Sequence, residues 1–289
     1  LTGLFMYRDE PAGEASARAF LGDFDQGTAD FENCTGSYRF RAVYPDGREL
    51  RFCDNAGVMR WYIRENICPF TEDNCPPPQR HSFCTSLAEA VPEDRAPDYA
   101  SIAQFLYFGC IYGTGTIFRG VRRSAPEKYY VIENGLLTEK DKNLKPLEDL
   151  ELHGDALEEQ MSRFSKAVGG GAAACTITGG TDSRNILSHM LHEGMRPLLD
   201  ITGASGHVDV VIARKIAGRL DMELLWVSDD MEGGDWIDKA VQAADGMTGV
   251  CGIYRLNKKA RALKERGVLM ECGSIAGEFY KNDFIHFDY

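Results

Sequence analysis

The sequence predicts two domains of different class. An α+β domain with an antiparallel sheet layer is expected over residues 1–145, followed by an α/β domain with a parallel sheet over residues 152–289. Alternating runs joined by turn signals fill the first half, whereas strand-like and helix-like runs alternate in the second. A hydrophobic content of 44% in 289 residues is enough for two buried cores, and the charged stretch 140–153 is the predicted linker.

Two hairpin signals predict the antiparallel layer. Pro45-Asp46-Gly47 lies between alternating runs at 37–45 and 49–54, and Asn134-Gly135 follows the strand-like run 129–132. Further strands are expected at 1–7 and 57–63, a helix around 15–21, and an exposed, proline-containing loop at 66–82. The first half is therefore expected to be rich in antiparallel sheet.

The second half carries the pattern of a parallel sheet. After an amphipathic helix at 156–168, strands are expected at 173–177, 198–201, 224–227 and 268–271. Ligands of such sheets bind at the carboxyl ends of the strands. A ligand is therefore expected near the residues that follow these strands, among them Thr178, Thr202 and Cys272.

Residues 172–184 form the segment with the most specific chemistry. A short apolar strand breaks at Gly179 and Gly180 and leads into an amphipathic helix. The glycines let backbone N–H groups approach a phosphate, and the helix presents unpaired N–H groups and its positive dipole end. Hydroxyl groups that can add hydrogen bonds belong to Thr178, Thr181 and Ser183. Asp182 would repel phosphate unless a divalent cation lay between them, so the loop predicts phosphate with Mg²⁺.

This loop resembles the S-G-G-x-D-S signature of the ATP pyrophosphatases, with Thr178 in the first serine position. In that family the loop holds the pyrophosphate of ATP while the α-phosphorus is attacked, and AMP is released. The resemblance therefore implies an ATP pyrophosphatase fold for the second domain, with ATP and Mg²⁺ as cofactors. The nucleotide-binding residues that it implies are Thr178, Gly179, Gly180, Thr181, Asp182, Ser183, Thr202, Gly203 and Gly273.

A second segment, after the fourth predicted strand, resembles the stretch G-E-G-A-D-E-L-F-G-G-Y of asparagine synthetase, in which carboxylates hold Mg²⁺ and the pyrophosphate. Gly273, Ala276 and Glu278 fit this stretch, whereas Ser274 and Gly277 stand where acidic residues are expected. The resemblance implies Asp182 and Glu278 as metal ligands. It implies the same two residues and Lys281 as catalytic residues, and Lys281 would neutralise charge on the α-phosphate. The alternative is that the two glycines only serve a turn at the strand end.

The first half resembles the amino-terminal glutaminase-type domain of asparagine synthetase, which has an Ntn-type fold. The matching stretches are, in order, 36–40 (G-x-F-x-F), 53–62 (R-D-x-x-G-x-x-P-L-Y), 83–90 (F-A-S-E-x-K-A-L) and 116–121 (T-L-F-K-G-I). The family requires an amino-terminal Cys, and here Thr2 stands in its place and follows Leu1. The glutamine-binding segments of the family have no counterpart before Gly36. We therefore expect a shortened domain without glutaminase activity.

The two resemblances together predict an ATP-dependent, amide-forming ligase similar to asparagine synthetase. A substrate carboxylate would be adenylated, and ammonia or a substrate amine would then displace AMP. One alternative is a pseudoenzyme or scaffold that binds ATP or AMP without turnover. Another alternative is a pyrophosphatase that adenylates a nucleobase or tRNA for thiolation. The acidic net charge and the lack of paired catalytic cysteines near the loop argue against it.

The composition limits the partners and the compartment. A net charge of −12 and a pI near 5.0 argue against nucleic acid or an anionic membrane as the main partner. The expected partners are a small-molecule carboxylate and an amine or ammonia. No apolar run is long enough to span a bilayer, so a cytoplasmic location is expected. The oligomeric state stays open, with a homodimer as one arrangement.

Three other features have ordinary explanations. The nine cysteines are expected to be mostly reduced and buried, as is usual in a cytosolic chain. The alternative is a zinc site formed by Cys68, Cys75, Cys84 and His81, whose spacing matches none of the usual zinc-binding patterns. Asp209 is expected as a carboxylate at a helix N-terminus, in a stretch similar to the family's D-x-x-x-A-x-x-x-A-x-x-L. The basic run 256–266 is expected to be a solvated helix surface, with a phosphate or carrier-protein contact as the alternative.

Overall fold

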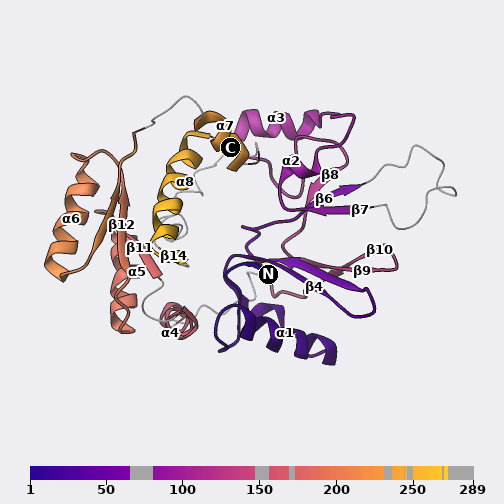
Figure 1. Cartoon of the computed structure of the whole chain (residues 1–289), viewed down its shortest axis with the longest axis horizontal. Coiled ribbons are helices and arrows are strands. Elements are labelled where there is room, and N and C mark those ends of the chain that lie inside the picture. The colour runs from indigo at the N-terminus through magenta and orange to yellow at the C-terminus, as the bar shows by residue number, and fades with distance from the viewer. Residues whose placement is uncertain are drawn as a thin grey trace. The chain divides into compact units, whose positions relative to one another are not determined.

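The computed structural model describes residues 1–65, 81–146, 156–168, 173–230, 236–243, 245, 250–268 and 270–272. The chain divides into two compact units, and Figure 1 labels many of their elements. Unit 1 comprises Leu1–Glu151 and Asp238–Ile253, and unit 2 comprises Leu152–Ile237 and Tyr254–Tyr289. Residues 238–253, which the sequence places in the second domain, therefore group with the first unit.

Unit 1 is built from antiparallel sheets. Its largest sheet has the strand order β1-β4-β5-β9-β10, and two smaller sheets have the orders β7-β6-β8 and β2-β3. The strands are β1 (Thr2–Gly3), β2 (Met6–Tyr7), β3 (Cys34–Thr35), β4 (Tyr38–Val43), β5 (Glu49–Cys53), β6 (Tyr62–Glu65), β7 (His81–Cys84), β8 (Val121–Arg123), β9 (Lys128–Glu133) and β10 (Leu136–Asp141). The helices are α1 (Glu14–Gln26), α2 (Leu87–Ala90) and α3 (Tyr99–Phe108).

Both predicted hairpins are confirmed. β4 and β5 form an antiparallel pair on either side of the Pro45-Asp46-Gly47 turn. β9 and β10 are joined by two residues, Asn134 and Gly135, whose φ angles are 50° and 76°. Positive φ at both central positions is what a type I′ turn requires, and Asn-Gly adopts it readily. This turn therefore fixes the register of the β9–β10 pair.

The strand expected at residues 1–7 is wrong in its extent. Two short strands occupy this segment, and they belong to different sheets. Gly3 has a φ of +88°, and a Cβ added to it would lie 2.2 Å from the carbonyl oxygen of Ser37. The chain turns away from β4 at this close approach, so a glycine is required there and the strand cannot continue.

The strand expected at residues 57–63 begins only at Tyr62. The preceding residues form a turn around Asp54, whose carboxylate is fully buried. This carboxylate accepts hydrogen bonds from the backbone N–H groups of Val58 and Met59, both at 2.8 Å. These two bonds satisfy the buried carboxylate and hold the turn, which replaces the first part of the expected strand.

Aromatic side chains fill the core of unit 1. Phe20, on α1, is fully buried. Its ring centroid lies 5.0 to 5.9 Å from those of Phe5, Tyr7, Phe31, Phe40 and Phe52. These partners come from the amino-terminal segment, from a short 3-10 helix at Phe31–Asn33 and from two strands of the large sheet. One helical side chain therefore joins α1 to the rest of the unit.

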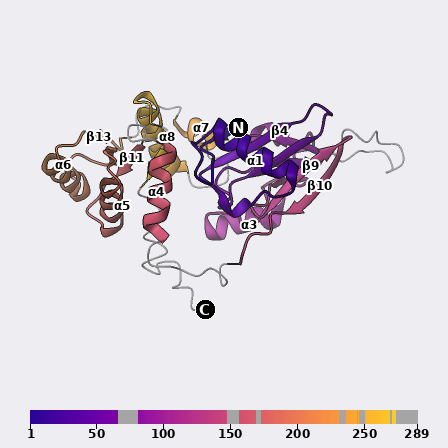
Figure 2. The same ribbon diagram turned by 90° about the horizontal axis from the view of Figure 1, so that it is seen from below.

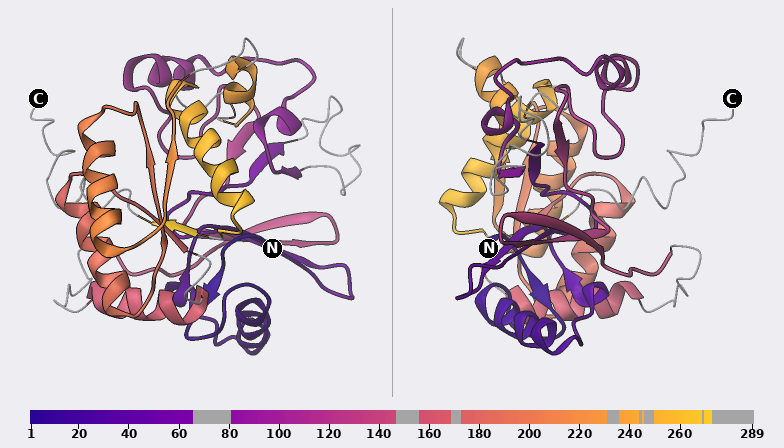
Figure 3. Two further views of the ribbon diagram at one scale, coloured as in Figure 1. Left: turned by 60° about the vertical axis from the view of Figure 1, so that its left-hand side comes forward. Right: turned by 90° about the vertical axis from the view of Figure 1, so that its right-hand side faces the viewer.

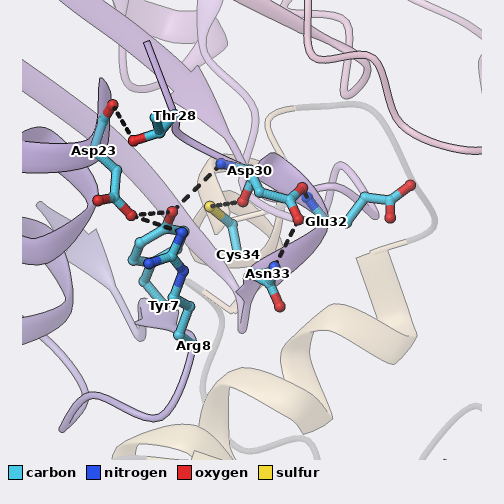
Figure 4. A network of polar contacts seen from close by, with 8 residues as sticks. All are labelled: Tyr7, Arg8, Asp23, Thr28, Asp30, Glu32, Asn33 and Cys34. Carbon is cyan, nitrogen blue, oxygen red and sulfur yellow. Dashed lines mark hydrogen bonds and ion pairs between the residues drawn. The ribbon is translucent and has the colours of Figure 1, made fainter. Parts of the chain in front are cut away.

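A polar network ties the beginning of the chain to the end of α1 (Figure 4). The Tyr7 hydroxyl donates to Asp23 Oδ2 at 2.8 Å, and Arg8 pairs with the same carboxylate at 2.9 Å. The Asp30 N–H donates to the Tyr7 hydroxyl at 3.4 Å, and the Asp30 carboxylate accepts from Asn33 Nδ2 at 2.7 Å. Burial and the hydrogen bond to Asp23 raise the pKa of Tyr7, so its phenol stays neutral.

Unit 2 is built around a parallel sheet with the strand order β13-β12-β11-β14. Its strands are β11 (Ala173–Thr176), β12 (Leu198–Thr202), β13 (Leu224–Val227) and β14 (Met270–Cys272). The helices of this half of the chain are α4 (Ala156–Val168), α5 (Thr181–His192), α6 (Val208–Leu220), α7 (Trp236–Ala243) and α8 (Val250–Glu265), of which α7 and α8 contain residues of both units. The predicted strands are confirmed, with ends that shift by at most two residues. No helix in the described ranges is long and apolar enough to cross a membrane.

Helices lie on both faces of the parallel sheet, as Figures 2 and 3 show. One face of the sheet packs against α5 and α6. The buried residues at this contact are Cys175, Ile177, Leu199 and Ile201 from the sheet and Leu187, Met190, Val210 and Ala213 from the two helices. Successive strand residues point to opposite faces. Thr176 and Asp200 therefore point to the other face, where they meet Lys259 of α8.

Replacing Phe20 by Ala should lower the free energy of unfolding of unit 1 by about 3–5 kcal/mol, because it removes a buried ring and leaves a cavity. Urea titration followed by tyrosine and tryptophan fluorescence would measure the loss. Val43→Ala is the control, since the Val43 side chain is 59% exposed. Equal losses in the two variants would contradict a core centred on Phe20.

Candidate functional site

The candidate site lies where β11 gives way to α5. β11 ends at Thr176, the chain passes through Gly179 and Gly180, and α5 begins at Thr181. The predicted order of strand, glycine turn and helix is confirmed. The turn lies at the carboxyl end of a parallel strand, which is the edge of such a sheet where ligands bind.

The hydroxyl groups of Thr178 and Ser183 form hydrogen bonds inside the turn. The Thr178 N–H donates to Ser183 Oγ at 3.1 Å, and the two hydroxyl oxygens lie 3.0 Å apart. The Gly180 N–H donates to Thr178 Oγ1 at 3.1 Å. Ser183 is almost fully buried. The hydroxyls expected to contact phosphate therefore also shape the loop.

Asp209 joins the turn to α6. Its Oδ1 accepts a hydrogen bond from the Gly179 N–H at 2.9 Å. A Cβ added to Gly179 would lie 2.7 Å from Ile212 Cδ1 and 3.1 Å from the same carboxylate oxygen, so a larger residue would require both side chains to shift. Asp209 lies in the first turn of α6, as the sequence predicts, and the contact with the loop is a second role that the sequence did not reveal.

These contacts change which backbone groups are open to an anion. The N–H groups of residues 178–180, expected to cradle phosphate, are already bonded to side chains. Within the described part of the chain, no side chain caps the N-terminus of α5. The first turn of a helix leaves its N–H groups without intrahelical partners, and its dipole favours anions. An anion is therefore expected to meet the first turn of α5, beside Asp182.

The end of β12 lies at the same edge of the sheet. The Gly203 N–H donates to Val227 O at 3.1 Å, and its carbonyl accepts from Trp226 Nε1 at 2.9 Å. Thr202 Oγ1 is out of contact with solvent and has no hydrogen-bond partner among the residues that the structure describes. A buried hydroxyl of this kind is costly unless something bonds to it, so Thr202 remains a candidate for ligand contact.

A buried ion pair below the turn was not predicted. Lys259 Nζ lies 3.0 Å from Thr176 Oγ1 and 3.5 Å from Asp200 Oδ1, and Thr176 Oγ1 donates to Asp200 Oδ1 at 2.8 Å. Lys259 is 6% exposed and Asp200 is fully buried. The expectation of a solvated surface for the basic run is therefore wrong for Lys259. Two features of the sequence could have indicated this buried pair. Asp200 lies inside an apolar strand, and Lys259 lies three residues after Leu256 and four before Leu263, on the apolar stripe of its helix.

Two further basic residues of α8 reach the segment that follows β13. Lys258 Nζ donates to Asp230 O at 3.4 Å, and Arg255 lies 3.9 Å from Asp229. Both contacts are largely exposed, so each contributes little to stability. Together with Lys259 they place positive charge near the carboxyl edge of the sheet, where phosphate is expected.

Several expected site residues, namely Gly273, Ser274, Gly277, Glu278 and Lys281, lie outside the described residues. The described residues contain no cluster of three or more His, Cys, Asp or Glu side chains that could hold a metal. Mg²⁺ commonly takes one or two protein carboxylates and completes its shell with water and substrate phosphates. Asp182 at the start of α5, with the hydroxyls around it, is an oxygen-only set that fits this role. Cys68 and Cys75 of the alternative zinc site also fall outside the described residues.

A scan of protein-family models finds no match to the chain, and a search of curated proteins finds none either. Function is therefore inferred from the residues and their geometry.

Lys259→Met should destabilise unit 2 by about 3–5 kcal/mol, because it removes one partner of a buried ion pair. Lys264→Met is the control, since Lys264 is exposed on the same helix. Chemical denaturation of both variants would compare them. Wild-type stability in Lys259→Met would show that the ion pair does not hold α8 against the sheet.

Gly179→Ala should cost about 1–3 kcal/mol, because the new methyl group would overpack against Ile212 and Asp209. Gly218→Ala in α6 should instead raise stability by about 0.5–1 kcal/mol, since open space surrounds it and Ala is the better helix former. Thermal unfolding of the two variants would show opposite shifts. A neutral Gly179→Ala would mean that the loop does not pack closely on α6.

Proposed function

We propose that this chain binds ATP with Mg²⁺ at the β11–α5 turn and forms an amide by adenylating a substrate carboxylate, as asparagine synthetases do. The observation that carries the proposal is the turn itself. A glycine pair at the end of a parallel strand leads into a helix that no side chain of the described residues caps, with Thr178, Asp182 and Ser183 at the spacing of the pyrophosphatase signature. The N-terminus of such a helix is a favourable place for a pyrophosphate group.

The chain's own groups would act by positioning and by charge. The first turn of α5 and the exposed Thr181 hydroxyl would bind the pyrophosphate oxygens. Asp182 would orient Mg²⁺, which when bound supplies charge neutralisation between this carboxylate and the phosphates. Thr202 lies at the end of the neighbouring strand, where it could donate to the nucleotide.

The reaction consists of two transfers. A carboxylate oxygen of the substrate attacks the α-phosphorus, and the bond from that phosphorus to pyrophosphate breaks, which gives an acyl-adenylate. The nitrogen of ammonia or of a substrate amine then attacks the acyl carbon, loses a proton, and expels AMP. Holding the carboxylate in line with the leaving pyrophosphate accounts for most of the rate gain.

Product analysis tests the proposal. The protein is incubated with Mg-ATP, a panel of carboxylic acids and amino acids, and either ammonia or glutamine, and nucleotides are separated by ion-exchange chromatography. AMP and pyrophosphate that appear only with a particular carboxylate would support the ligase. Formation of ADP would refute it. Turnover with glutamine alone would contradict the expectation that the first unit lacks glutaminase activity.

Asp182→Asn should lower the rate of AMP formation by about 10²–10³-fold, because the site loses the charge that orients the cation. Asp221→Asn is the matched control, since Asp221 is exposed, caps the end of α6 with a φ of 49°, and Asn tolerates that conformation. Initial rates at saturating Mg-ATP would compare the two. Equal activity of both variants would remove Asp182 from the mechanism.

A second candidate is nucleotide binding without turnover. It is favoured by the side-chain bonds that already occupy the N–H groups of residues 178–180, because a phosphate there would have to displace them. Ser274 and Gly277, at positions expected to be acidic, point the same way. ATP binding by calorimetry with no AMP from any carboxylate would select this candidate.

A further inference from the structure

Unit 1 contains a cavity of about 260 Å³ that is separate from the nucleotide site proposed in unit 2. Its walls come from β4, β6, β8, the turns beside them and one residue near the end of α7. The lining residues are Arg39, Gly57, Val58, Met59, Arg60, Tyr62, Thr85, Arg123 and Asp245. All of them belong to unit 1. Ligand pockets for larger organic molecules commonly start near 300 Å³, so this cavity suits a small molecule.

The cavity is positively charged in a chain whose net charge is −12. Arg39, Arg60 and Arg123 contribute three positive charges and Asp245 one negative charge, which leaves two positive charges in the lining. Burial, followed by the charge of Arg60, lowers the pKa of Arg123. Like charges brought together in this way repel each other unless an anion lies between them.

Backbone carbonyls hold the arginines in place but do not neutralise them. Arg39 donates to Thr85 O. Arg60 donates to Gly113 O at 2.6 Å, and Arg123 donates to the same oxygen at 3.0 Å. Across the described ranges, none of the three arginines forms an ion pair with a carboxylate. The guanidinium groups are thus oriented by neutral carbonyl groups, and the nearby carboxylates of Glu89 and Asp245 offset only part of their charge.

Two of the guanidinium groups also retain unused donors. Arg39 Nε and Arg123 Nε are out of contact with solvent and have no hydrogen-bond partner among the described residues. A buried donor without an acceptor is costly, and more so when it carries charge. Because both Nε atoms are shielded from solvent, an anion in the cavity would meet the terminal N–H groups of these arginines.

Asp245, the acidic side chain among these lining residues, already accepts hydrogen bonds from other parts of unit 1. Asp245 Oδ1 accepts the Leu87 N–H at 2.9 Å, and the Asp245 carboxylate also accepts the Tyr62 hydroxyl. Burial and then Asp245 raise the pKa of Tyr62, so the phenol stays neutral. Asp245 therefore fixes Tyr62 and α2, and it leaves the arginines to a different anion.

We propose that this cavity is a binding site for a small oxyanion with two negative charges, in which the guanidinium groups of Arg39, Arg60 and Arg123 hold a phosphate or a short dicarboxylate. Guanidinium forks match the oxygen pairs of both groups. The excess of positive charge among the lining residues suits a dianion, and the volume of about 260 Å³ suits a small one. The site is formed by residues of unit 1 alone.

Calorimetric titration at low salt would test the site with two probes, inorganic phosphate and succinate, and with chloride as a control anion. One probe should bind the wild-type protein, and whichever binds identifies the class. Arg123→Gln should weaken that binding at least roughly tenfold, the loss expected for one charge-assisted contact. Arg18→Gln, at an exposed position on α1, should leave it unchanged. No binding of either probe, or equal weakening in both variants, would overturn the proposal.

Because Arg123 also bonds to backbone carbonyls, Arg123→Gln could unfold part of unit 1. A measurement on the wild-type protein removes this ambiguity. Phenylglyoxal modifies accessible arginines, and mass spectrometry locates the adducts. The bound probe should protect Arg39, Arg60 and Arg123 by at least severalfold and leave Arg18 reactive. Unchanged modification of the three arginines at a saturating probe concentration would refute the site even if the variant does not fold.

Discussion

The buried contact among Lys259, Asp200 and Thr176 is the constraint on which the parallel-sheet unit depends. Both charged groups have lost nearly all of their contact with water, which is tolerated only when each has a partner of good geometry. Any other rotation of α8 would bury one charge without the other. The contact therefore fixes α8 on β11 and β12. The glycine turn begins directly beyond Thr176, so its position on the sheet follows from the same contact.

The turn has its shape before any ligand arrives. Ser183, Thr178 and Asp209 supply acceptors for the backbone donors of the turn, so ordering the loop adds little to the cost of binding. The same contacts direct an anion away from the glycines, because it would have to displace a carboxylate there. The first turn of α5 is the alternative, and Asp182 lies within it. A phosphate and this carboxylate are compatible only with a cation between them.

The sequence predicts the features that depend on local residues. The Asn134-Gly135 hairpin, the four parallel strands and the turn at Gly179 each follow from turn chemistry or periodicity over a few residues. The errors come from contacts between distant segments. The strand ends at Gly3 because the Ser37 carbonyl lies close to it, and the residues next to Gly3 in the sequence do not indicate this contact.

The candidate site divides in the same way. Thr178, Asp182 and Ser183 could be identified from their spacing alone, since the loop is continuous in sequence. Asp209 and Lys259 could not be assigned their contacts, because their partners come from other elements of the sheet. The arginine cavity in unit 1 combines residues from three strands and a distant segment, so only the folded chain brings its charges together.

Both proposed anion sites must work against the charge of the whole protein. A net charge of −12 repels anions at long range, although physiological salt screens this field beyond about 8 Å. Binding must therefore come from groups that converge within a few ångströms of the ligand. Three arginines in a small cavity meet this requirement, and the repulsion between Arg60 and Arg123 is relieved when an anion lies between them. An anion that relieves the repulsion binds only the folded unit, so occupancy of the cavity and stability of the fold are thermodynamically linked.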